Sequence, residues 1–199
     1  MVLDNYGKII EMIEKNNGFI TTGQITDAGI QRRLLTELTE SGKLYRVERG
    51  IYALPTTWED EMYYLQYRFS KGIFSNETAL YLHGLSDKTP SAYTMTFPIG
   101  YNTQSAKKAG VLTKLTIDEI YGLGIIEIPS PCQNPIRVYD KERTLCDIVK
   151  SKNACEIGIV NAAMKSYTHS RDKNINKLFS YAEQLRVKHK ILRYMEVLL

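Results

Sequence analysis

One stretch of the sequence, residues 19–54, restricts the fold more than any other, because it indicates both the type and the order of its elements. A short helix is expected after Phe19-Ile20, where a threonine of Thr21-Thr22 can cap the first turn. Ala28-Gly29 then turns the chain, and a longer helix is expected from about Ile30 to Ser41. A hairpin follows over Leu44–Leu54. Two helices joined by a glycine turn and followed by a hairpin leave few folds open.

At about 100° per residue, the longer helix is amphipathic. Its apolar positions share one side and its polar positions the other, so it can bury one face and present the second to a ligand. In the hairpin, Gly50 permits the positive φ of a tight turn at Glu48-Arg49-Gly50. This order of elements predicts a winged helix-turn-helix, a fold that reads DNA with its second helix. The apolar side holds Ile30, Leu34, Leu35 and Leu38, and the polar side Arg32, Arg33, Thr36 and Glu40.

Three groups of side chains are candidates for contact with DNA. Arginines at the start of the longer helix can bond O6 and N7 of guanine together, and arginines of a wing suit the minor groove. Polar groups at the start of the short helix can bond a phosphate. Glu37 and Glu40 should face away from phosphates or repel them. The alternative is a packing or protein-docking module with solvated arginines. The candidate DNA-binding residues are Thr21, Thr22, Gln24, Arg32, Arg33, Thr36, Lys43, Arg46 and Arg49.

The distribution of charge is more informative than the net value of +4. Residues 1–55 hold seven Lys and Arg against seven Asp and Glu, so a basic surface there depends on placement alone. Residues 137–199 hold thirteen against seven. That basic third is compatible with a phosphate backbone, with an acidic partner or with a plain solvated surface, and charge does not choose among them.

The composition predicts an ordinary globular protein that works in the cytoplasm. Apolar residues make up 43% and charged residues 24% of the chain. No apolar run is long enough to span a membrane, and the N-terminus lacks the order of a secretory signal. The spacing of the three cysteines and three histidines fits no metal or redox site, so we expect neither a metal nor a cofactor.

The remainder of the chain predicts a larger domain of helices and strands. A helix is expected over residues 59–70, after the wing closes at Pro55, and it forms part of a connection over 58–70. We therefore predict a winged helix-turn-helix domain over 1–55 and a C-terminal domain over 56–199, an α+β fold. Short β-type runs are Thr94–Pro98, Gly124–Ile128 and Ile136–Tyr139, and helices follow over Asp140–Lys150 and, in two or three pieces, to Leu199.

The sequence contains no recognised catalytic motif, and we expect a protein that is not an enzyme. The one cluster of acidic residues near an expected helix start consists of Asp140, Glu142 and Asp147. Asp140 and Glu142 are expected to stabilise that end and Asp147 to pair with Arg143. The rival hypothesis is that the C-terminal domain is an enzyme that uses these carboxylates with a metal. His83 has no nucleophile or carboxylate partner in the local sequence, so we expect it to be structural.

Three segments give the chain a family resemblance over nearly its whole length. It resembles the AbiEi-type antitoxins of bacterial abortive-infection systems. The later two segments are more specific than the winged head, which many regulators share. The segments are Arg49-Gly-Ile-Tyr-Ala-Leu54, Phe74-Ser-Asn-Glu-Thr-Ala-Leu-Tyr-Leu-His-Gly-Leu85 and Val138-Tyr-Asp-Lys-Glu-Arg-Thr-Leu-Cys-Asp147.

The resemblance implies an antitoxin that also represses its own operon by binding inverted repeats in double-stranded DNA. It implies a C-terminal domain that counters a co-encoded nucleotidyltransferase-like toxin, without a stable complex being assumed. Arg32, Arg33, Arg46 and Arg49 are carried over as DNA contacts on this basis. The alternative from another class is a winged-helix transcription factor whose C-terminal domain senses a ligand or is an enzyme. The operator, the oligomeric state and the residues of neutralisation are not given by the sequence.

Overall fold

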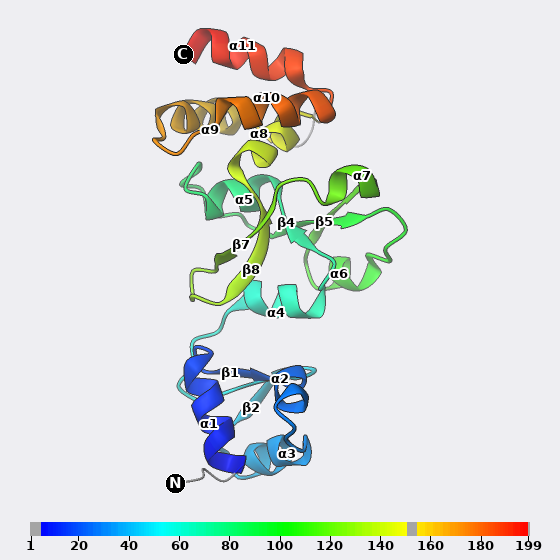
Figure 1. Ribbon diagram of the computed structural model, residues 1–199, viewed down its shortest axis with the longest axis vertical. Coiled ribbons are helices and arrows are strands. Elements are labelled where there is room, and N and C mark those ends of the chain that lie inside the picture. The colour runs from blue at the N-terminus through cyan, green and yellow to red at the C-terminus, as the bar shows by residue number, and fades with distance from the viewer. Residues whose placement is uncertain (1–4, 151–154, 199) are drawn as a thin grey trace. The chain divides into compact units, whose positions relative to one another are not determined.

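The computed structural model describes residues 5–150 and 155–198. These residues form two compact units, one from Met1–Arg68 with Pro129–Pro135 and one from Phe69–Ile128 with Ile136–Leu199. The fold is α+β, as predicted, with a winged helix-turn-helix first and a larger mixed region after it (Figure 1). The expected functional boundary between residues 55 and 56 does not coincide with the boundary of the compact units.

The first unit is a three-stranded antiparallel sheet, β1-β3-β2, with four helices. Phe19 of β1 packs against Tyr63 and Tyr64, with ring centroids 5.5 and 5.7 Å apart. These rings attach the connecting helix to the winged sheet, which is why it groups with this unit. The elements are α1 (Asn5–Lys15), β1 (Phe19–Thr21), α2 (Thr22–Asp27), α3 (Arg33–Glu40), β2 (Tyr45–Glu48), β3 (Ile51–Ala53) and α4 (Glu61–Arg68).

A short segment from the middle of the chain, Pro129–Pro135, completes the first unit. Asp60, only 3% exposed, accepts hydrogen bonds on one carboxylate oxygen from the Ser130 hydroxyl (2.5 Å) and the Asn134 amide (2.8 Å). Its other oxygen accepts from the backbone N–H of Tyr63 and so caps α4. The buried carboxylate is satisfied only because this distant segment returns to it.

The second unit has a five-stranded sheet in the order β6-β5-β4-β8-β7. β4 pairs with β5 antiparallel and with β8 parallel, and β5 pairs with β6 parallel. The strands are β4 (Ile73–Phe74), β5 (Thr94–Pro98), β6 (Leu112–Thr116), β7 (Ile125–Pro129) and β8 (Pro135–Tyr139), and the helices are α5 (Asn76–Leu82), α6 (Gln104–Lys108), α7 (Asp118–Tyr121), α8 (Lys141–Lys150), α9 (Ile157–His169), α10 (Ile175–Gln184) and α11 (Lys188–Leu198).

Helix α8 is the centre of the second unit. It packs against α5 on the sheet side and against α9, α10 and α11 on the other side (Figure 1). Thr144, Leu145 and Ile148 of this helix are buried. Leu145 and Ile148 join one apolar core that extends through the C-terminal helices to Met195. Burial of this face accounts for most of the stability expected of a helical layer.

Candidate nucleic-acid interface

The start of α2 is held by a capping box between Thr21 and Gln24. The Gln24 backbone N–H donates to the Thr21 hydroxyl at 3.2 Å, and the Thr21 backbone N–H donates to the Gln24 side-chain oxygen at 2.8 Å. The predicted threonine cap is therefore confirmed, and the structure shows that Thr21 provides it. Thr21 is only 6% exposed, so its hydroxyl is committed to holding the helix.

Thr22 links α2 to the wing. Its backbone N–H donates to the carbonyl of Gly50 at 2.9 Å. Gly50 has a φ of +85°, and a Cβ there would lie 3.0 Å from the Tyr67 hydroxyl and 3.1 Å from that of Thr22. The positive φ and the small space for a Cβ both favour glycine at this position. The hydrogen bond from Thr22 holds the turn of the wing against the helix-turn-helix.

The recognition helix α3 begins later than the sequence pattern indicates. Gly29 has a φ of +70°, and the Ile30 backbone N–H donates to the carbonyl of Ile25, so three residues expected in the helix, 30–32, precede it. Arg32 becomes the N-cap residue of α3 and remains exposed. Its Nε donates to the Thr26 hydroxyl of α2 at 2.8 Å. This bond leaves the terminal nitrogens of the guanidinium free to meet an acceptor.

Arg33, the first residue of α3, is held by a carboxylate one turn further along. Its Nε lies 2.9 Å from Glu37 Oε1, and its side chain is 83% exposed. The hydroxyl of Tyr6 in α1 donates to the other oxygen of Glu37. We expected Glu37 to face away from phosphates or repel them, and the structure shows that it orients an arginine. The chain Tyr6–Glu37–Arg33 thus connects α1 to the start of the recognition helix.

The wing presents Lys43, Arg46 and Arg49 to solvent. Glu48, the carboxylate of the hairpin, is paired with Arg68 of α4 at 3.0 Å. Its other oxygen accepts from the Arg49 backbone N–H. For the residues that the structure describes, no ion pair joins a carboxylate to Lys43, Arg46 or Arg49. The wing therefore keeps its positive charge, although the net charge of residues 1–55 is zero.

The nine candidate residues thus differ in their availability. Thr36 and the five cations are exposed, Thr22 and Gln24 are half-buried, and Thr21 is buried. Sequence reasoning missed three residues that position this surface, namely Tyr6, Thr26 and Arg68. Each lies on another element from its partner, and only the fold brings the two together. DNA contact by the candidates stays a prediction.

The carboxylates that were considered for catalysis in the second unit have structural partners. Asp140 accepts from the Arg143 backbone N–H at 2.8 Å, which caps α8 as predicted. The Lys177 ammonium lies 2.9 Å from Asp140 and 3.4 Å from Glu142. Burial lowers the pKa of Lys177, but the two carboxylates outweigh it and the net direction is upward. Glu142 also accepts from the Tyr167 hydroxyl at 2.8 Å.

Arg143 is the most buried charge of this network, at 1% exposure. Its Nε is 3.0 Å from Asp147, so the predicted pair four residues apart is confirmed. One terminal nitrogen donates to the carbonyls of Ile120 and Leu123, and the guanidinium lies 4.3 Å from the centre of the Tyr139 ring. Burial raises the pKa of Asp147, and Arg143 opposes that shift. These contacts show that Arg143 and Asp147 form a buried ion pair that holds α8 in place.

His83 ends α5 and lies 2.7 Å from the carbonyl of Tyr139 through Nε2. Burial lowers the pKa of His83, so the neutral ring with a proton on Nε2 is the favoured form. Burial also raises the pKa of the Cys146 thiol to about 12 and of the Cys155 thiol to about 11. Both thiols are protonated and unreactive at neutral pH.

The described residues contain no group of three or more His, Cys, Asp and Glu side chains arranged to hold a metal ion. None of the helices in this part of the chain has both the length and the apolar character needed to cross a membrane.

A capped short helix, a glycine turn, an exposed basic helix start and a two-stranded wing define the N-terminal region as a winged helix-turn-helix domain of the DNA-binding class. Residues 8–55 match the family described as transcriptional regulator, AbiEi antitoxin. The predicted resemblance is therefore confirmed over this segment. No curated protein matches the chain.

A solved structure is similar over nearly the whole chain. It is the crystal structure of the RV2827C protein from Mycobacterium tuberculosis, which superposes with a TM-score of 0.52 at 13% sequence identity. The match covers 99% of this chain and 82% of that one. At this identity the likeness concerns the fold alone, and it includes the second unit, which lies outside the family match.

Proposed function

We propose that this chain is the antitoxin of an abortive-infection toxin–antitoxin pair and also the repressor of its own operon. The winged head binds inverted repeats in the promoter, and the C-terminal region neutralises a co-encoded nucleotidyltransferase-like toxin in the bacterial cytoplasm. The observation that carries the proposal is the match of residues 8–55 to the AbiEi antitoxin regulators, on a head whose cations are exposed.

The placement of the arginines supports DNA recognition by the head. Thr26 holds Arg32 by one nitrogen and Glu37 holds Arg33 by one nitrogen. Both guanidinium groups therefore keep their terminal nitrogens for a bidentate contact with guanine. Because the partners already restrict the rotamers, less side-chain entropy is lost on binding. The cations of the wing add phosphate or minor-groove contacts.

The state of the carboxylates supports neutralisation without catalysis by the second unit. Asp140 and Glu142 share Lys177, and Asp147 is paired with Arg143. A carboxylate acting as a general base or metal ligand must offer an unengaged oxygen to the reaction. Loss of toxin neutralisation in a Glu142→Gln variant that folds normally would instead revive the enzymatic alternative.

Operator binding tests the head. The double variant Arg32→Ala with Arg33→Ala should lose specific affinity for a promoter fragment by at least about tenfold, because each base contact contributes on the order of 1–3 kcal/mol. Fluorescence anisotropy at several salt concentrations measures this loss. The double variant should still rescue cells from the toxin.

The matched control is Arg171→Ala with Lys173→Ala, which removes the same charge from exposed positions of the second unit. That variant should bind the operator almost as the natural chain does. Equal losses in the two double variants would reduce the effect to net charge and contradict the assignment to α3. If the natural chain fails to rescue cells from the toxin, the antitoxin part of the proposal is wrong.

A further inference from the structure

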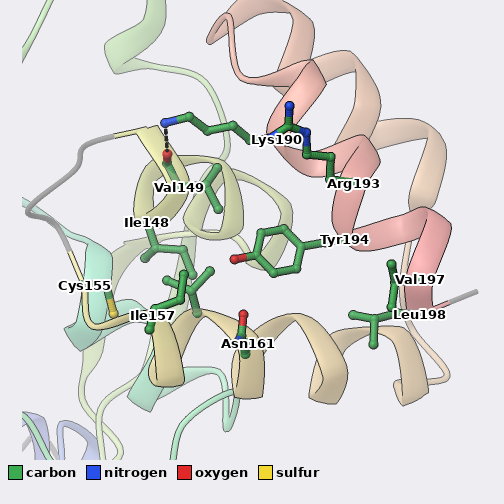
Figure 2. A pocket seen from close by; sticks show the side chains of 11 residues that line it. Ile148, Val149, Cys155, Ile157, Asn161, Lys190, Arg193, Tyr194, Val197 and Leu198 are labelled. Carbon is green, nitrogen blue, oxygen red and sulfur yellow. Dashed lines mark hydrogen bonds between the residues drawn. The ribbon is translucent and has the colours of Figure 1, made fainter.

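A groove of about 710 Å³ lies in the second unit between α9 and α11, and the end of α8 closes its base (Figure 2). We call it the α9–α11 groove. Figure 2 shows Tyr194 of α11 and Asn161 of α9 pointing into the space between the helices. Neither side chain has a hydrogen-bond partner among the described residues. The residues that the argument uses are Ile157, Val160, Asn161, Arg193, Tyr194 and Val197.

The apolar rim of the groove is unusually open to solvent. Ile157, at the start of α9, is 72% exposed, and Val197, near the end of α11, is 82% exposed. Val160 lies lower and is 4% exposed. Apolar side chains on both walls of one groove form a continuous patch, and patches of this kind mark interaction sites.

Helix α11 packs on the core of the second unit with one face and lines the groove with the adjoining face. Ile191 and Met195 are buried in the core of the second unit. The groove face consists of Lys190, Arg193, Tyr194, Val197 and Leu198. Tyr194 and Leu198 also pack against the core, whereas Val197 is 82% exposed. This spacing of three and four along two turns is the pattern by which one helix packs against another.

The charge of the groove has one sign. Lys190 and Arg193 are neighbours at one edge, where Lys190 Nζ donates to the carbonyl of Val149 at 2.7 Å (Figure 2). Arg193 has no hydrogen bond or ion pair among the described residues. Glu156 and Glu196 flank the groove in sequence, and Glu77 interacts with the Cys155 thiol, but none of the three carboxylates lines the groove. An occupant with carboxylates along one side complements this edge.

We propose that the α9–α11 groove binds an acidic amphipathic helix of a partner protein. The apolar face of that helix lies on Val160, Ile157 and Val197, and its carboxylates meet Arg193 and Lys190 along α11. Recognition of a helix in an apolar groove uses anchors at spacings of three, four and seven residues. The basic character of the last third of the chain then has a specific use.

Two other occupants fit less well. A second copy of the chain docked groove to groove would bring two basic surfaces together, because the charged residues that line each groove are Lys190 and Arg193. A small apolar ligand would leave Ile157 and Val197 largely in water, because both stand at the rim. A helix covers the floor and both rims together. The proposal can be tested independently of the proposed function, since its experiment uses synthetic peptides and neither DNA nor the toxin.

Two synthetic peptides of about 15 residues, long enough to form a helix, serve as probes. Both carry the same leucine stripe, and their flanks are glutamate in one and lysine in the other. Fluorescence anisotropy with the full chain should give an affinity at least about tenfold higher for the glutamate peptide, because like charges oppose the lysine peptide. Equal affinities, or no binding of either peptide, would overturn the proposal.

Three variants locate the binding. Val197→Asp should weaken binding of the glutamate peptide at least about tenfold, and Arg193→Glu should remove the preference over the lysine peptide. Both positions are exposed, so the fold should tolerate the changes. Leu192→Asp is the matched control, since Leu192 is 43% exposed on the same helix but does not line the groove. A loss with Leu192→Asp as large as with Val197→Asp would overturn the assignment to this groove.

The same samples test the other occupants. Dodecanoate is added as a small apolar carboxylate, and sedimentation velocity reports self-association. Tight binding of dodecanoate without binding of either peptide would replace the helix with a small ligand. A dimer that Val197→Asp dissociates would replace it with a second copy. The proposal stands only if the glutamate peptide binds and Val197→Asp weakens that binding.

Discussion

The two units use arginine in contrasting ways. Arg33 in the head is 83% exposed and has one carboxylate partner, so its remaining donors face solvent. Arg143 in the second unit is 1% exposed, and a carboxylate, two carbonyls and a tyrosine ring surround it. The exposed pair contributes little to folding, since solvent screens it. The buried pair cannot lose one partner without leaving a charge unpaired in the interior.

The comparison shows which charged residues of this chain are available to a ligand and which stabilise the fold. Charged groups that form ion pairs within the core already have their hydrogen-bond partners and are not available to a ligand. Charges at the start of α3 and on the wing retain unused donors, and those of the α9–α11 groove share it with the exposed apolar residues Ile157 and Val197. Stability measurements and binding measurements should therefore respond to different arginines.

Replacement of Arg143 by methionine should have the largest effect on stability. It keeps most of the side-chain volume but leaves Asp147 and the carbonyls of Ile120 and Leu123 without their donor. We expect the free energy of unfolding to fall by about 3–5 kcal/mol, the usual cost of removing one partner of a buried pair. Denaturant unfolding followed by circular dichroism measures the change.

Arg33→Met is the control for this prediction. It removes an exposed arginine with one carboxylate partner, and it should change the free energy of unfolding by less than about 1 kcal/mol. Similar losses in the two variants would mean that the contrast between exposed and buried arginines does not govern stability.

A smaller effect should appear in the pH dependence of stability at His83. Burial holds the pKa of this ring below its ordinary value of 6.5, so the unfolded chain binds a proton more readily than the folded one. The stabilisation is present above pH 6.5 and is lost as the pH falls through the lower pKa of the folded state. The free energy of unfolding should therefore decrease from pH 7 to pH 5.

His83→Gln should weaken that pH dependence, because glutamine does not titrate. The measurement is a series of chemical denaturation curves between pH 5 and pH 7. His189→Gln, at an exposed position of α11, is the control for loss of an imidazole and should keep the slope of the natural chain. An unchanged slope in His83→Gln would rule out this residue as its source.

The smallest effect is expected at Tyr6, where the head's exposed charges are positioned. Tyr6→Phe removes the hydroxyl that bonds Glu37 and should loosen Arg33. The preference for operator over unrelated DNA should drop by less than about tenfold, in line with one hydrogen bond worth about 1 kcal/mol. Competition binding at fixed salt measures the preference.

Tyr52→Phe is the matched control, because no partner is described for that hydroxyl in β3. If both tyrosine variants lowered the preference equally, the Tyr6–Glu37–Arg33 chain would have no role in discrimination. If neither did, Arg33 would be positioned without help from α1.

The winged head was readable from the sequence because its signals are local. Apolar residues at helical spacing, Thr21 and Gly50 indicated α2, α3 and the hairpin directly. The start of α3 was placed too early because Ile30 fits the apolar stripe although it lies in the turn. The ion pair between Arg143 and Asp147 within α8 was also predictable, and so was the cap at Asp140, since both follow fixed spacings along one helix.

The rest depended on contacts between distant parts of the chain. β6 and its neighbours α6 and α7 were not predicted, because they are short and largely exposed and so lack a clear apolar period. Arg68 and Thr26 gained their positioning roles only through tertiary contacts. The α9–α11 groove was equally invisible, since a stripe of exposed apolar residues on one helix has no meaning until its neighbour is known.

The return of Pro129–Pro135 to Asp60 limits how this protein can be taken apart or recombined. The chain passes from one unit to the other three times, after Arg68, after Ile128 and after Pro135. A single cut at any of these points cannot yield both units whole, and a fragment ending at Arg68 would leave the buried Asp60 carboxylate without two donors. A functional graft of this head onto another regulator must therefore carry two separate pieces of sequence.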